Sequence, residues 1–456
     1  MKILQEGDKG VFSKYPMLME EIKKNVSNLR LHMFMLITEG EGGMIMYNAI
    51  TNEALLFEDG DDMFCEHMVN NLWLVPEEFD EVGFVVQFRE NLFNSRRKTL
   101  KPRGYTIVTT TDCNARCFYC YEKGIAKKNM TQKTAHDLAG YIIKNYKENP
   151  DENKPEVTLS WFGGEPLHNK PVISIICKRL RDADVPYRSS MISNGYYFNE
   201  ETIEEAKSLW KLRNVQITLD GTEEVYNKAK NYIDKSRSPF QVVTDNIDAL
   251  TKNGIRVSVR VNVGYYNRED IKKLVEYLRE RFTGRKNFSI YFHALFDMGG
   301  VTDIDTEEKE KEVYETMASL EEQVAKYGLS GERGLNAPRG SHCMADNGSH
   351  VTVQADGHFS LCEHYVDSYQ VGGLYDDGFD NEIIKKFKEI APPFDECYTC
   401  PIFPGCSNLV MCEDNEVKCG MYRQNYKIQK KIRAMKALER RMKREEKKIK
   451  NEGESK

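Results

Sequence analysis

The chain of 456 residues contains 65 Lys and Arg, 71 Asp and Glu and 40% hydrophobic residues, with a formal net charge of −6. This is an ordinary composition for a water-soluble protein with several domains, and its acidic balance gives no overall case for nucleic-acid binding. No apolar run approaches the length of a membrane helix, and the N-terminus lacks the apolar core of a signal peptide, so we predict a cytoplasmic protein without membrane contact. Twelve cysteines in such a chain favour metal ligands over disulfides.

Residues 1–95 predict a small N-terminal α+β domain. Residues 32–38 and 44–47 have the composition of short strands, and the Glu-Gly-Glu-Gly-Gly between them predicts a hairpin turn. Residues 54–57 predict a third strand, residues 61–74 a helix, and residues 79–93 a further strand or helix. The edge of such a hairpin can bind an extended peptide; the alternative is a domain that only packs against the rest of the chain.

A tight cysteine motif follows an apolar strand candidate at residues 106–110. Cys113, Cys117 and Cys120 have C-x3-C-x2-C spacing, and three thiolates this close can hold an iron–sulfur cube at three irons and leave the fourth iron open. A structural zinc site is the alternative, but it normally has a fourth Cys or His nearby, and none follows within the next dozen residues. A disulfide is a weaker alternative in a cytoplasmic protein. The motif therefore predicts an iron–sulfur cluster with a site for a ligand.

Between residues 96 and 300 the chain alternates apolar strands with amphipathic helices. The strand candidates are residues 106–111, 157–162, 187–193, 215–219, 256–263 and 288–295. Helical periodicity lies between them, for instance at residues 201–212, 244–252 and 270–282. Six β/α units in series predict an α/β fold with a parallel sheet curved into a partial barrel.

Polar and glycine residues gather where these predicted strands end, which is where such barrels carry out their chemistry. Glycine lets the backbone approach a ligand closely, and polar side chains bind its charged groups. The strand-end residues are Gly163, Gly164, Glu165, Ser193, Asp220, Arg260 and Asn262.

Together with the cysteines, these residues resemble the signature of the radical S-adenosylmethionine (SAM) enzymes, C-x3-C-x-aromatic-C, with Tyr119 in the aromatic position. In that family the open iron is chelated by the amino and carboxylate groups of SAM. One electron then cleaves SAM to methionine and a 5′-deoxyadenosyl radical, which abstracts a hydrogen atom from the substrate. The resemblance implies Gly163, Gly164 and Glu165 at the SAM amino group, Ser193 and Asp220 at the ribose or carboxylate, Phe118 and Tyr119 at the adenine, and Arg260 and Asn262 as further members of the set.

A linker helix is predicted within residues 301–337, and a second cysteine region occupies residues 338–425. Its cysteines are Cys343, Cys362, Cys397, Cys400, Cys406, Cys412 and Cys419. Paired C-x2-C units also occur in zinc ribbons, but seven cysteines are one short of two closed four-ligand sites.

The spacing of this region resembles the SPASM extension of radical SAM enzymes, except that five residues instead of three precede Cys412. That resemblance implies two auxiliary [4Fe-4S] clusters, and therefore three clusters in the chain. The outer cluster would be held by Cys397, Cys400, Cys406 and Cys419, and the inner one by Cys343, Cys362 and Cys412. The inner cluster then has an open iron or a ligand other than cysteine, with His342 and His364 as candidates.

Residues 426–456 form a tail rich in Lys and Arg in which apolar residues are sparse. This pattern predicts a basic helix that is solvated and frays.

The resemblance covers most of the chain and predicts a SPASM-type radical SAM maturase. It would join side chains of a ribosomally made precursor peptide through a thioether or carbon–carbon bond, with electrons from an external donor such as flavodoxin or ferredoxin. One alternative is a sulfatase-maturating type that oxidises a protein Cys or Ser to formylglycine; in those relatives an Asp follows the position of Cys362, where this chain has Glu363. The other alternative is a non-catalytic electron-transfer or scaffold protein, against which the intact Gly-Gly-Glu-Pro stretch argues.

Glu363 adjoins a predicted ligand of the inner cluster. A cross-link removes two hydrogens overall, so a proton must leave, and a carboxylate at this place can accept it. An open cluster iron that deprotonates a substrate thiol is one alternative. The other is that Glu363 only accepts hydrogen bonds that hold the cluster loop.

Overall fold

The structure is a computed structural model, and it describes residues 1–8, 20, 28–63, 65–94, 101–150, 155–295, 302–331, 335, 344–345, 348–366, 368–376, 378–386, 393–406 and 419–454. The chain divides into two compact units. The hairpin unit comprises Met1–Arg97, Glu332–Cys343 and Glu389–Lys456, and the barrel unit comprises Lys98–Gly331 and Met344–Lys388. Residues 338–425, predicted as one domain, are divided between the two units.

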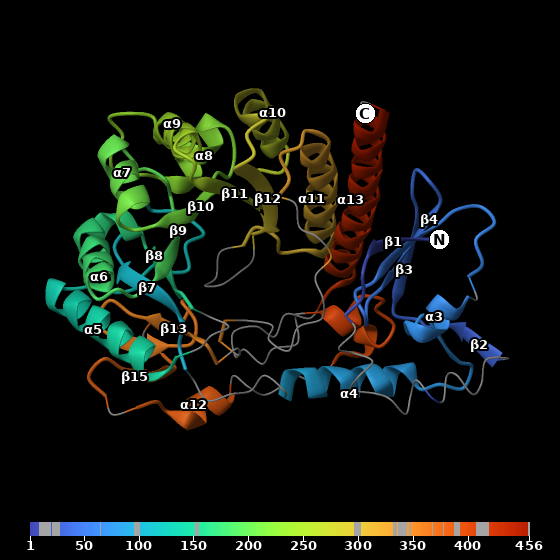
Figure 1. Cartoon of the computed structure of the whole chain (residues 1–456). Coiled ribbons are helices and arrows are strands. Elements are labelled where there is room, and N and C mark those ends of the chain that lie inside the picture. The colour runs from blue at the N-terminus through green and yellow to red at the C-terminus, as the bar shows by residue number, and fades with distance from the viewer. Residues whose placement is uncertain are drawn as a thin grey trace. The chain divides into compact units, whose positions relative to one another are not determined.

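A nine-stranded sheet in the order β12-β11-β10-β9-β8-β7-β13-β14-β15 forms the centre of the barrel unit. Strands β7 to β12 pair with one another in parallel and curve within the unit (Figure 1). Their bounds are β7 (Gly104–Thr110), β8 (Val157–Gly163), β9 (Tyr187–Ser193), β10 (Leu212–Thr218), β11 (Arg256–Val263) and β12 (Phe288–Ala294). The prediction of six parallel strands in a partial barrel is therefore confirmed.

The helices between these strands lie along one side of the curved sheet (Figure 1). They are α5 (Gln132–Glu148), α6 (Lys170–Asp182), α7 (Glu200–Ser208), α8 (Glu223–Lys230), α9 (Pro239–Lys252) and α10 (Asp270–Phe282), with the short 3-10 helix η2 (Pro166–Asn169) before α6. In α10, the buried residues Ile271, Leu274, Leu278 and Phe282 recur at helical spacing and form its apolar face. The helix predicted within residues 301–337 is α11 (Glu307–Lys326), which begins after the N-cap Thr306.

The predicted helix at residues 201–212 extends too far at its C-terminal end. Helix α7 ends at Ser208, Lys211 has a positive φ of 49°, and Leu212 already begins β10. The apolar residues that continued the helical pattern, Leu209 and Trp210, are buried in the short connection instead. Connections between a helix and the next parallel strand are typically this short, so helical periodicity alone misplaced the boundary.

The first part of the second cysteine region extends the barrel sheet. Strand β13 (His350–Val353) pairs in parallel with β7, and β14 (His358–Ser360) and β15 (Gln370–Gly373) follow in antiparallel order. The turn between β13 and β14 contains Gly357 with a φ of 93°, a backbone conformation that favours glycine. Helix α12 (Asn381–Lys386) follows β15 within the barrel unit.

The hairpin unit contains a four-stranded antiparallel sheet in the order β1-β5-β4-β3. Its elements, with those around it, are β1 (Lys2–Gln5), β2 (Leu29–Leu31), β3 (Met35–Glu39), β4 (Met44–Asn48), β5 (Ala54–Phe57), α3 (Glu66–Asn70), β6 (Leu74–Pro76), α4 (Glu81–Asn94), η3 (Asp395–Cys397), η4 (Phe403–Gly405) and α13 (Met421–Glu454). The predicted hairpin is confirmed as β3 and β4, although its first strand begins at Met35 and not at residue 32. Strand β1, which pairs with β5, was not predicted, and the segment at residues 79–93 is the helix α4.

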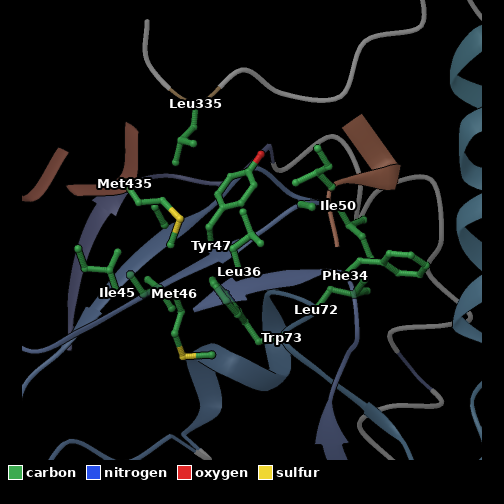
Figure 2. Close-up of a cluster of buried hydrophobic side chains, with 14 of the residues drawn as sticks. Phe34, Leu36, Ile45, Met46, Tyr47, Ile50, Leu72, Trp73, Leu335 and Met435 are labelled. Atoms are coloured by element: carbon green, nitrogen blue, oxygen red, sulfur yellow. The ribbon is translucent and has the colours of Figure 1, made fainter. Parts of the chain in front are cut away.

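One hydrophobic core joins the beginning and the end of the chain in this unit. Figure 2 shows Phe34, Tyr47 and Trp73 packed together, with Leu335 and Met435 in the same cluster. The core also includes Cys400, Ile402 and Phe403 from the second cysteine region. Residues 1–94 thus share their core with later segments of the hairpin unit.

The prediction of a solvated C-terminal tail is wrong for part of helix α13. Its residues Met435 and Glu439 are completely buried. The Glu439 carboxylate accepts hydrogen bonds from the backbone N–H groups of Glu41 at 2.9 Å and Gly42 at 2.7 Å, in the turn between β3 and β4. The helix therefore closes the core of the hairpin unit along this stretch. Across the described ranges no helix is both long and apolar enough to cross a membrane.

Candidate active site

The loop that carries Cys113, Cys117 and Cys120 follows the carboxyl end of β7. Because β7 to β12 are parallel, the motifs after β8, β9, β10 and β11 meet at this same edge. Backbone hydrogen bonds hold the loop against the end of α8 and the residues that follow it: Arg116 N–H donates to Lys230 O at 3.0 Å, and Ile233 N–H donates to Asn114 O at 2.9 Å. The sequence prediction that the cysteine loop and the strand ends share one edge of the sheet is confirmed.

The three sulfurs lie close enough to influence one another. The pKa of Cys113 is raised to about 12, mainly by burial and then by Glu165, Cys117 and Cys120, although the Ala115 N–H bond to its sulfur lowers it. The pKa of Cys117 is raised as well, and burial is the main cause, although the neighbouring Lys230 lowers it. Thiols with such raised pKa values stay protonated at neutral pH unless a cation stabilises the thiolate. The iron of a cluster provides that positive charge when the cluster binds.

Across the described part of the chain, no group of three or more His, Cys, Asp or Glu residues is arranged to hold a single metal ion. A four-iron cluster takes one thiolate at each of three irons, so its three cysteines do not converge on one point. The donor set of three neighbouring sulfurs on one short loop therefore fits a cluster.

Gly163 and Gly164 bring the end of β8 against the cysteine loop. Gly163 has a φ of 135°, and a Cβ there would lie 2.1 Å from the carbonyl oxygen of Thr110. A Cβ at Gly164 would lie 2.5 Å from the carbonyl oxygen of Asp112. Their backbone continues this contact, because Gly164 N–H donates to Thr110 O and Glu165 N–H donates to Asp112 O, each at 3.0 Å. Any larger residue would push the loop away.

Glu165 is completely buried beneath the loop. Its carboxylate accepts hydrogen bonds from the Ser193 hydroxyl at 2.9 Å and from the Asn194 N–H at 2.7 Å. Burial raises the pKa of Glu165 to about 7, against these hydrogen bonds, which lower it. A buried carboxylate of this kind is ready to bind a positively charged group that reaches it.

Asp220 is also completely buried and belongs to a polar network around the aromatic residue of the motif. Its Oδ1 accepts the Asn262 N–H at 2.9 Å, and its Oδ2 contacts the Tyr119 hydroxyl and lies 3.2 Å from Lys230 Nζ. Lys230 Nζ also donates to the Tyr119 hydroxyl at 2.6 Å. Burial alone would lower the pKa of Lys230, but Asp220 and Cys117 raise it above its ordinary value.

The remaining predicted residues lie around this network. The Phe118 ring meets the rings of Tyr119 and Tyr266 edge to face, each with centroids 5.1 Å apart. Arg260 Nε donates to the Asn262 side-chain oxygen at 2.9 Å. The structure thus gathers all the predicted strand-end residues at one edge, with Ser193, Asp220 and Asn262 almost fully buried.

Sequence reasoning did not select Lys230, although it is the only cation that the structure places at hydrogen-bond distance from both Asp220 and Tyr119 among the described residues. Its position at the end of α8 follows no motif. Asn194 was also not selected, yet its amide donates to Asn114 Oδ1 at 2.6 Å and lies 3.8 Å from the Cys113 sulfur. The Ser-Asn-Gly sequence after β9 was the available signal for it.

The segment Cys362–Glu363–His364 follows β14 within the barrel unit. The His364 ring lies 4.5 Å from the ring of Tyr121, the residue after Cys120. Burial raises the pKa of Tyr121 well above its ordinary value, and the carboxylates of Glu122 and Glu363 raise it further. Glu363 therefore lies near the cysteine loop, as does Glu122, whose own pKa burial raises to about 7.

Four further cysteines come together in the hairpin unit. Cys400 N–H donates to Cys397 O at 3.1 Å, and Cys406 N–H donates to Phe403 O at 3.1 Å, so tight turns arrange these residues. Burial raises the pKa of Cys397, and Cys406, Cys400 and Cys419 raise it further. Of the other predicted ligands, Cys343, Cys412 and His342 lie outside the described residues.

Comparison with known proteins relates part of this chain to a protein family. Residues 107–278 match the model of the Radical SAM superfamily. The chain is similar to the cysteine-type anaerobic sulfatase-maturating enzyme of Clostridium novyi (strain NT), with 21% identity over 65% of this chain and 84% of the relative.

Two solved structures share the fold at low identity. Native anSMEcpe with bound AdoMet and Cp18Cys peptide superimposes with a TM-score of 0.57 at 16% identity, over 74% of this chain and 99% of that chain. Streptococcus suis SuiB bound to precursor peptide SuiA superimposes with a TM-score of 0.50 at 12% identity, over 85% of this chain and 96% of that chain.

Proposed function

Because residues 107–278 match the model of the Radical SAM superfamily, we propose that the chain cleaves SAM reductively and cross-links side chains of a ribosomally synthesised precursor peptide through a thioether or carbon–carbon bond. The observation that carries this proposal is the cysteine loop seated at the strand edge with Glu165 and Ser193 directly beneath it. Relatives that bind a precursor peptide or a substrate peptide support the class of substrate.

Cys113, Cys117 and Cys120 would hold the first [4Fe-4S] cluster. Around it we assign SAM binding to the residues of the resemblance: Gly163, Gly164 and Glu165 for the amino group, Ser193 and Asp220 for the ribose or carboxylate, Phe118 and Tyr119 for the adenine, and Arg260 and Asn262 beside them. The buried Glu165 carboxylate is the strongest of these assignments, since a positive group on a ligand would offset the cost of its burial.

Two auxiliary clusters complete the proposal. Cys397, Cys400, Cys406 and Cys419 would hold the outer cluster, and Cys343, Cys362 and Cys412 the inner one, with His342 or His364 as a further candidate ligand. Formation of one cross-link removes one hydrogen atom, one electron and one proton from the peptide. With SAM and the clusters bound, the SAM-derived fragment would remove the hydrogen atom and an auxiliary cluster would remove the electron. Glu363 would accept that proton.

The partners that this reaction needs are the precursor peptide and an external electron donor such as flavodoxin or ferredoxin. Strand β3 is an edge strand of the hairpin sheet, and its central residue Ile37 is 47% exposed. An edge of this kind can add an extended peptide as a further strand. We assign recognition of a leader segment to this edge of residues 1–95.

A second candidate function is oxidation of a protein Cys or Ser to formylglycine. The observation that favours it is the similarity to the sulfatase-maturating enzyme over 84% of that protein's length. Glu363 at the place of an Asp keeps a carboxylate after Cys362 and is compatible with both reactions.

The experiment begins with anaerobically reconstituted protein, for which three clusters predict about twelve irons per chain. Reductant and SAM should yield 5′-deoxyadenosine, and the variant with Cys113, Cys117 and Cys120 changed to Ala should yield none while it retains auxiliary iron. Undiminished 5′-deoxyadenosine from that variant would refute the assignment, and zinc in place of auxiliary iron would refute the outer and inner clusters.

Mass spectrometry of a precursor peptide separates the two functions. Short peptides encoded beside the gene for this chain are the candidates. A cross-link removes two hydrogens and joins two side chains, whereas formylglycine formation from cysteine replaces sulfur with oxygen and leaves an aldehyde. A protein that never cleaves SAM under these conditions would be the non-catalytic electron-transfer protein instead.

A further inference from the structure

The ammonium nitrogen of Lys427 is buried in the second turn of α13. Within the described residues it has no hydrogen-bond partner. On the same helix the neighbouring Ile428 packs against the hydrophobic cluster that contains Cys400. The sulfurs of Cys406 and Cys419 lie within electrostatic reach of the Lys427 ammonium and raise its pKa, although burial has the larger effect and lowers it. A buried cation without a partner is unfavourable, so this arrangement calls for an anion at the cysteines.

Lys431, one helical turn further along α13, provides a direct comparison. Its ammonium donates to the Tyr47 hydroxyl at 3.3 Å and lies 5.0 Å from the centre of the Tyr47 ring. The two lysines of α13 therefore differ in their surroundings: Lys431 contacts Tyr47 in the hydrophobic core, whereas Lys427 interacts with the cysteine sulfurs. Helix amphipathicity alone does not require this difference.

A second buried cation approaches the same cysteines from α4. Arg89 is 6% exposed, and its guanidinium donates to the carbonyl oxygens of Phe403 at 2.6 Å and Cys406 at 3.0 Å. It also lies over the Phe403 ring at 4.9 Å. Arg89 thus holds the turn between Cys400 and Cys406 through these carbonyl contacts, and the sulfurs of Cys406 and Cys397 raise its pKa against the larger effect of burial. Helices α4 and α13 each bring a positive group to this one place.

Four thiolates around an iron–sulfur cluster give a group with net negative charge. The potential of such a cluster depends on its net charge, the hydrogen bonds to its sulfurs and its exposure. We propose that Lys427 compensates the charge of the cluster held by Cys397, Cys400, Cys406 and Cys419 and thereby raises its reduction potential. This inference rests on the outer cluster of the proposed function and adds the residue that sets its potential. Arg89 supports the same charge balance but is fixed by its carbonyl contacts.

The test is a redox titration followed by electron paramagnetic resonance, in the background where Cys113, Cys117 and Cys120 are Ala and only auxiliary clusters remain. Lys427→Met should make the reduction potential of one auxiliary cluster more negative. At a fixed solution potential, the ratio of reduced to oxidised cluster should fall about tenfold, which corresponds to about 59 mV for a one-electron couple. Lys427→Arg should restore the potential. Lys431→Met, which removes a buried charge of the same helix away from the cysteines, should leave both auxiliary potentials unchanged.

Equal potentials in Lys427→Met and the parent protein would overturn the inference. If Lys427→Met loses iron while Lys427→Arg and Lys431→Met retain it, the inference is supported, because charge at this position then decides retention. Equal iron loss from all three variants would overturn it. A parent protein without auxiliary iron contradicts the outer cluster of the proposed function itself, whereas auxiliary clusters with unshifted potentials contradict this inference alone.

Discussion

Lys230 Nζ lies 3.2 Å from Asp220 Oδ2, and both side chains are buried beside the cysteine loop. The backbone carbonyl of Lys230 also accepts the N–H of Arg116 within that loop. The pair therefore connects the end of α8 and the end of β10 to the segment that would hold the first cluster. A buried ion pair is fragile to single changes, because either partner alone is an uncompensated charge.

We expect Lys230→Met to lower the free energy of unfolding of the barrel unit by about 3 to 5 kcal/mol, since it leaves Asp220 buried and unpaired. Asp220→Asn should cost a similar amount. The double variant should cost much less than the sum, and denaturant unfolding of all four proteins without metal gives the coupling energy directly. Additive costs would show that the two charges do not depend on each other.

Glu165 makes stability depend on pH. Burial raises its pKa from an ordinary value of 4.5 to about 7, so between these values the folded barrel unit keeps a proton that the unfolded chain has released. The contribution of this group is therefore greatest below pH 4.5 and declines as the pH rises to 7. Ligand-free protein should lose up to about 3 kcal/mol of stability from this residue between pH 5 and pH 8.

Glu165→Gln isolates that contribution. The amide cannot ionise, so the unfolding free energy of the variant relative to the parent should rise from pH 5 to pH 8. Hydrogen bonds that Gln makes less well than Glu shift both values equally and leave the difference between the two pH values unaffected. A constant offset at pH 5 and pH 8 would show that Glu165 is ionised to the same extent in the folded and the unfolded chain at both pH values, and would remove the argument that it awaits a positive group.

Much of the barrel was accessible from sequence because its strands are continuous apolar runs between helices. Four of the six strands, β8, β9, β11 and β12, begin at the predicted residue. Lys230 was missed because its partner Asp220 lies ten positions earlier in the chain, and a lone lysine at a helix end is usually solvated. Strand β1 was missed because its pairing with β5 depends on contacts distant in sequence.

The C-terminal helix shows a different reason for error. Ile428, Ile432, Met435 and Met442 follow one side of α13 and pack against the core of the hairpin unit. Their spacing of four, three and seven residues is a helical stripe, but many Lys and Arg residues between them lower the overall hydropathy. Long basic side chains can cover apolar surface with their methylene groups, so composition underestimated burial here.

The leader-binding assignment needs a test other than removal of residues 1–95. If these residues only bound a leader segment, such a deletion should impair peptide modification and spare SAM cleavage. In the structure it would also remove Arg89, which binds the Cys406 carbonyl, and most of the core shared with Phe403 and Met435. A point change on the exposed strand avoids that damage.

Ile37→Glu places a charge in the middle of β3 and should weaken a peptide strand added at this edge. We expect peptide modification at subsaturating peptide to fall about tenfold, equivalent to about 1.4 kcal/mol of binding, with 5′-deoxyadenosine formation unchanged. Ile3→Glu is the matched control, because Ile3 is 46% exposed on β1 at the opposite edge of the same sheet. Equal effects of the two changes would mean that β3 has no special part in peptide binding.

Two carboxylates lie near Tyr121, and they offer a direct comparison of candidate proton acceptors. Glu363 follows Cys362, whose sulfur lies 3.8 Å from a Glu363 oxygen, and Glu122 follows Tyr121 in the cysteine loop. If Glu363 accepts the proton released on cross-linking, Glu363→Gln should leave hydrogen abstraction normal. The rate at which the cross-linked product forms should fall by about 10²- to 10⁴-fold. The measurement is 5′-deoxyadenosine and cross-linked peptide from the same reaction.

Glu122→Gln distinguishes the remaining explanations. Closure that fails in Glu122→Gln and proceeds at the parental rate in Glu363→Gln would transfer the role to Glu122. Parental rates in both variants would mean that neither carboxylate is the base, and deprotonation of a substrate thiol on an open iron of the inner cluster becomes the better explanation, because metal coordination itself lowers the pKa of a thiol. Loss of iron from Glu363→Gln, with closure lost in proportion, would identify Glu363 as a residue that only holds the Cys362 loop.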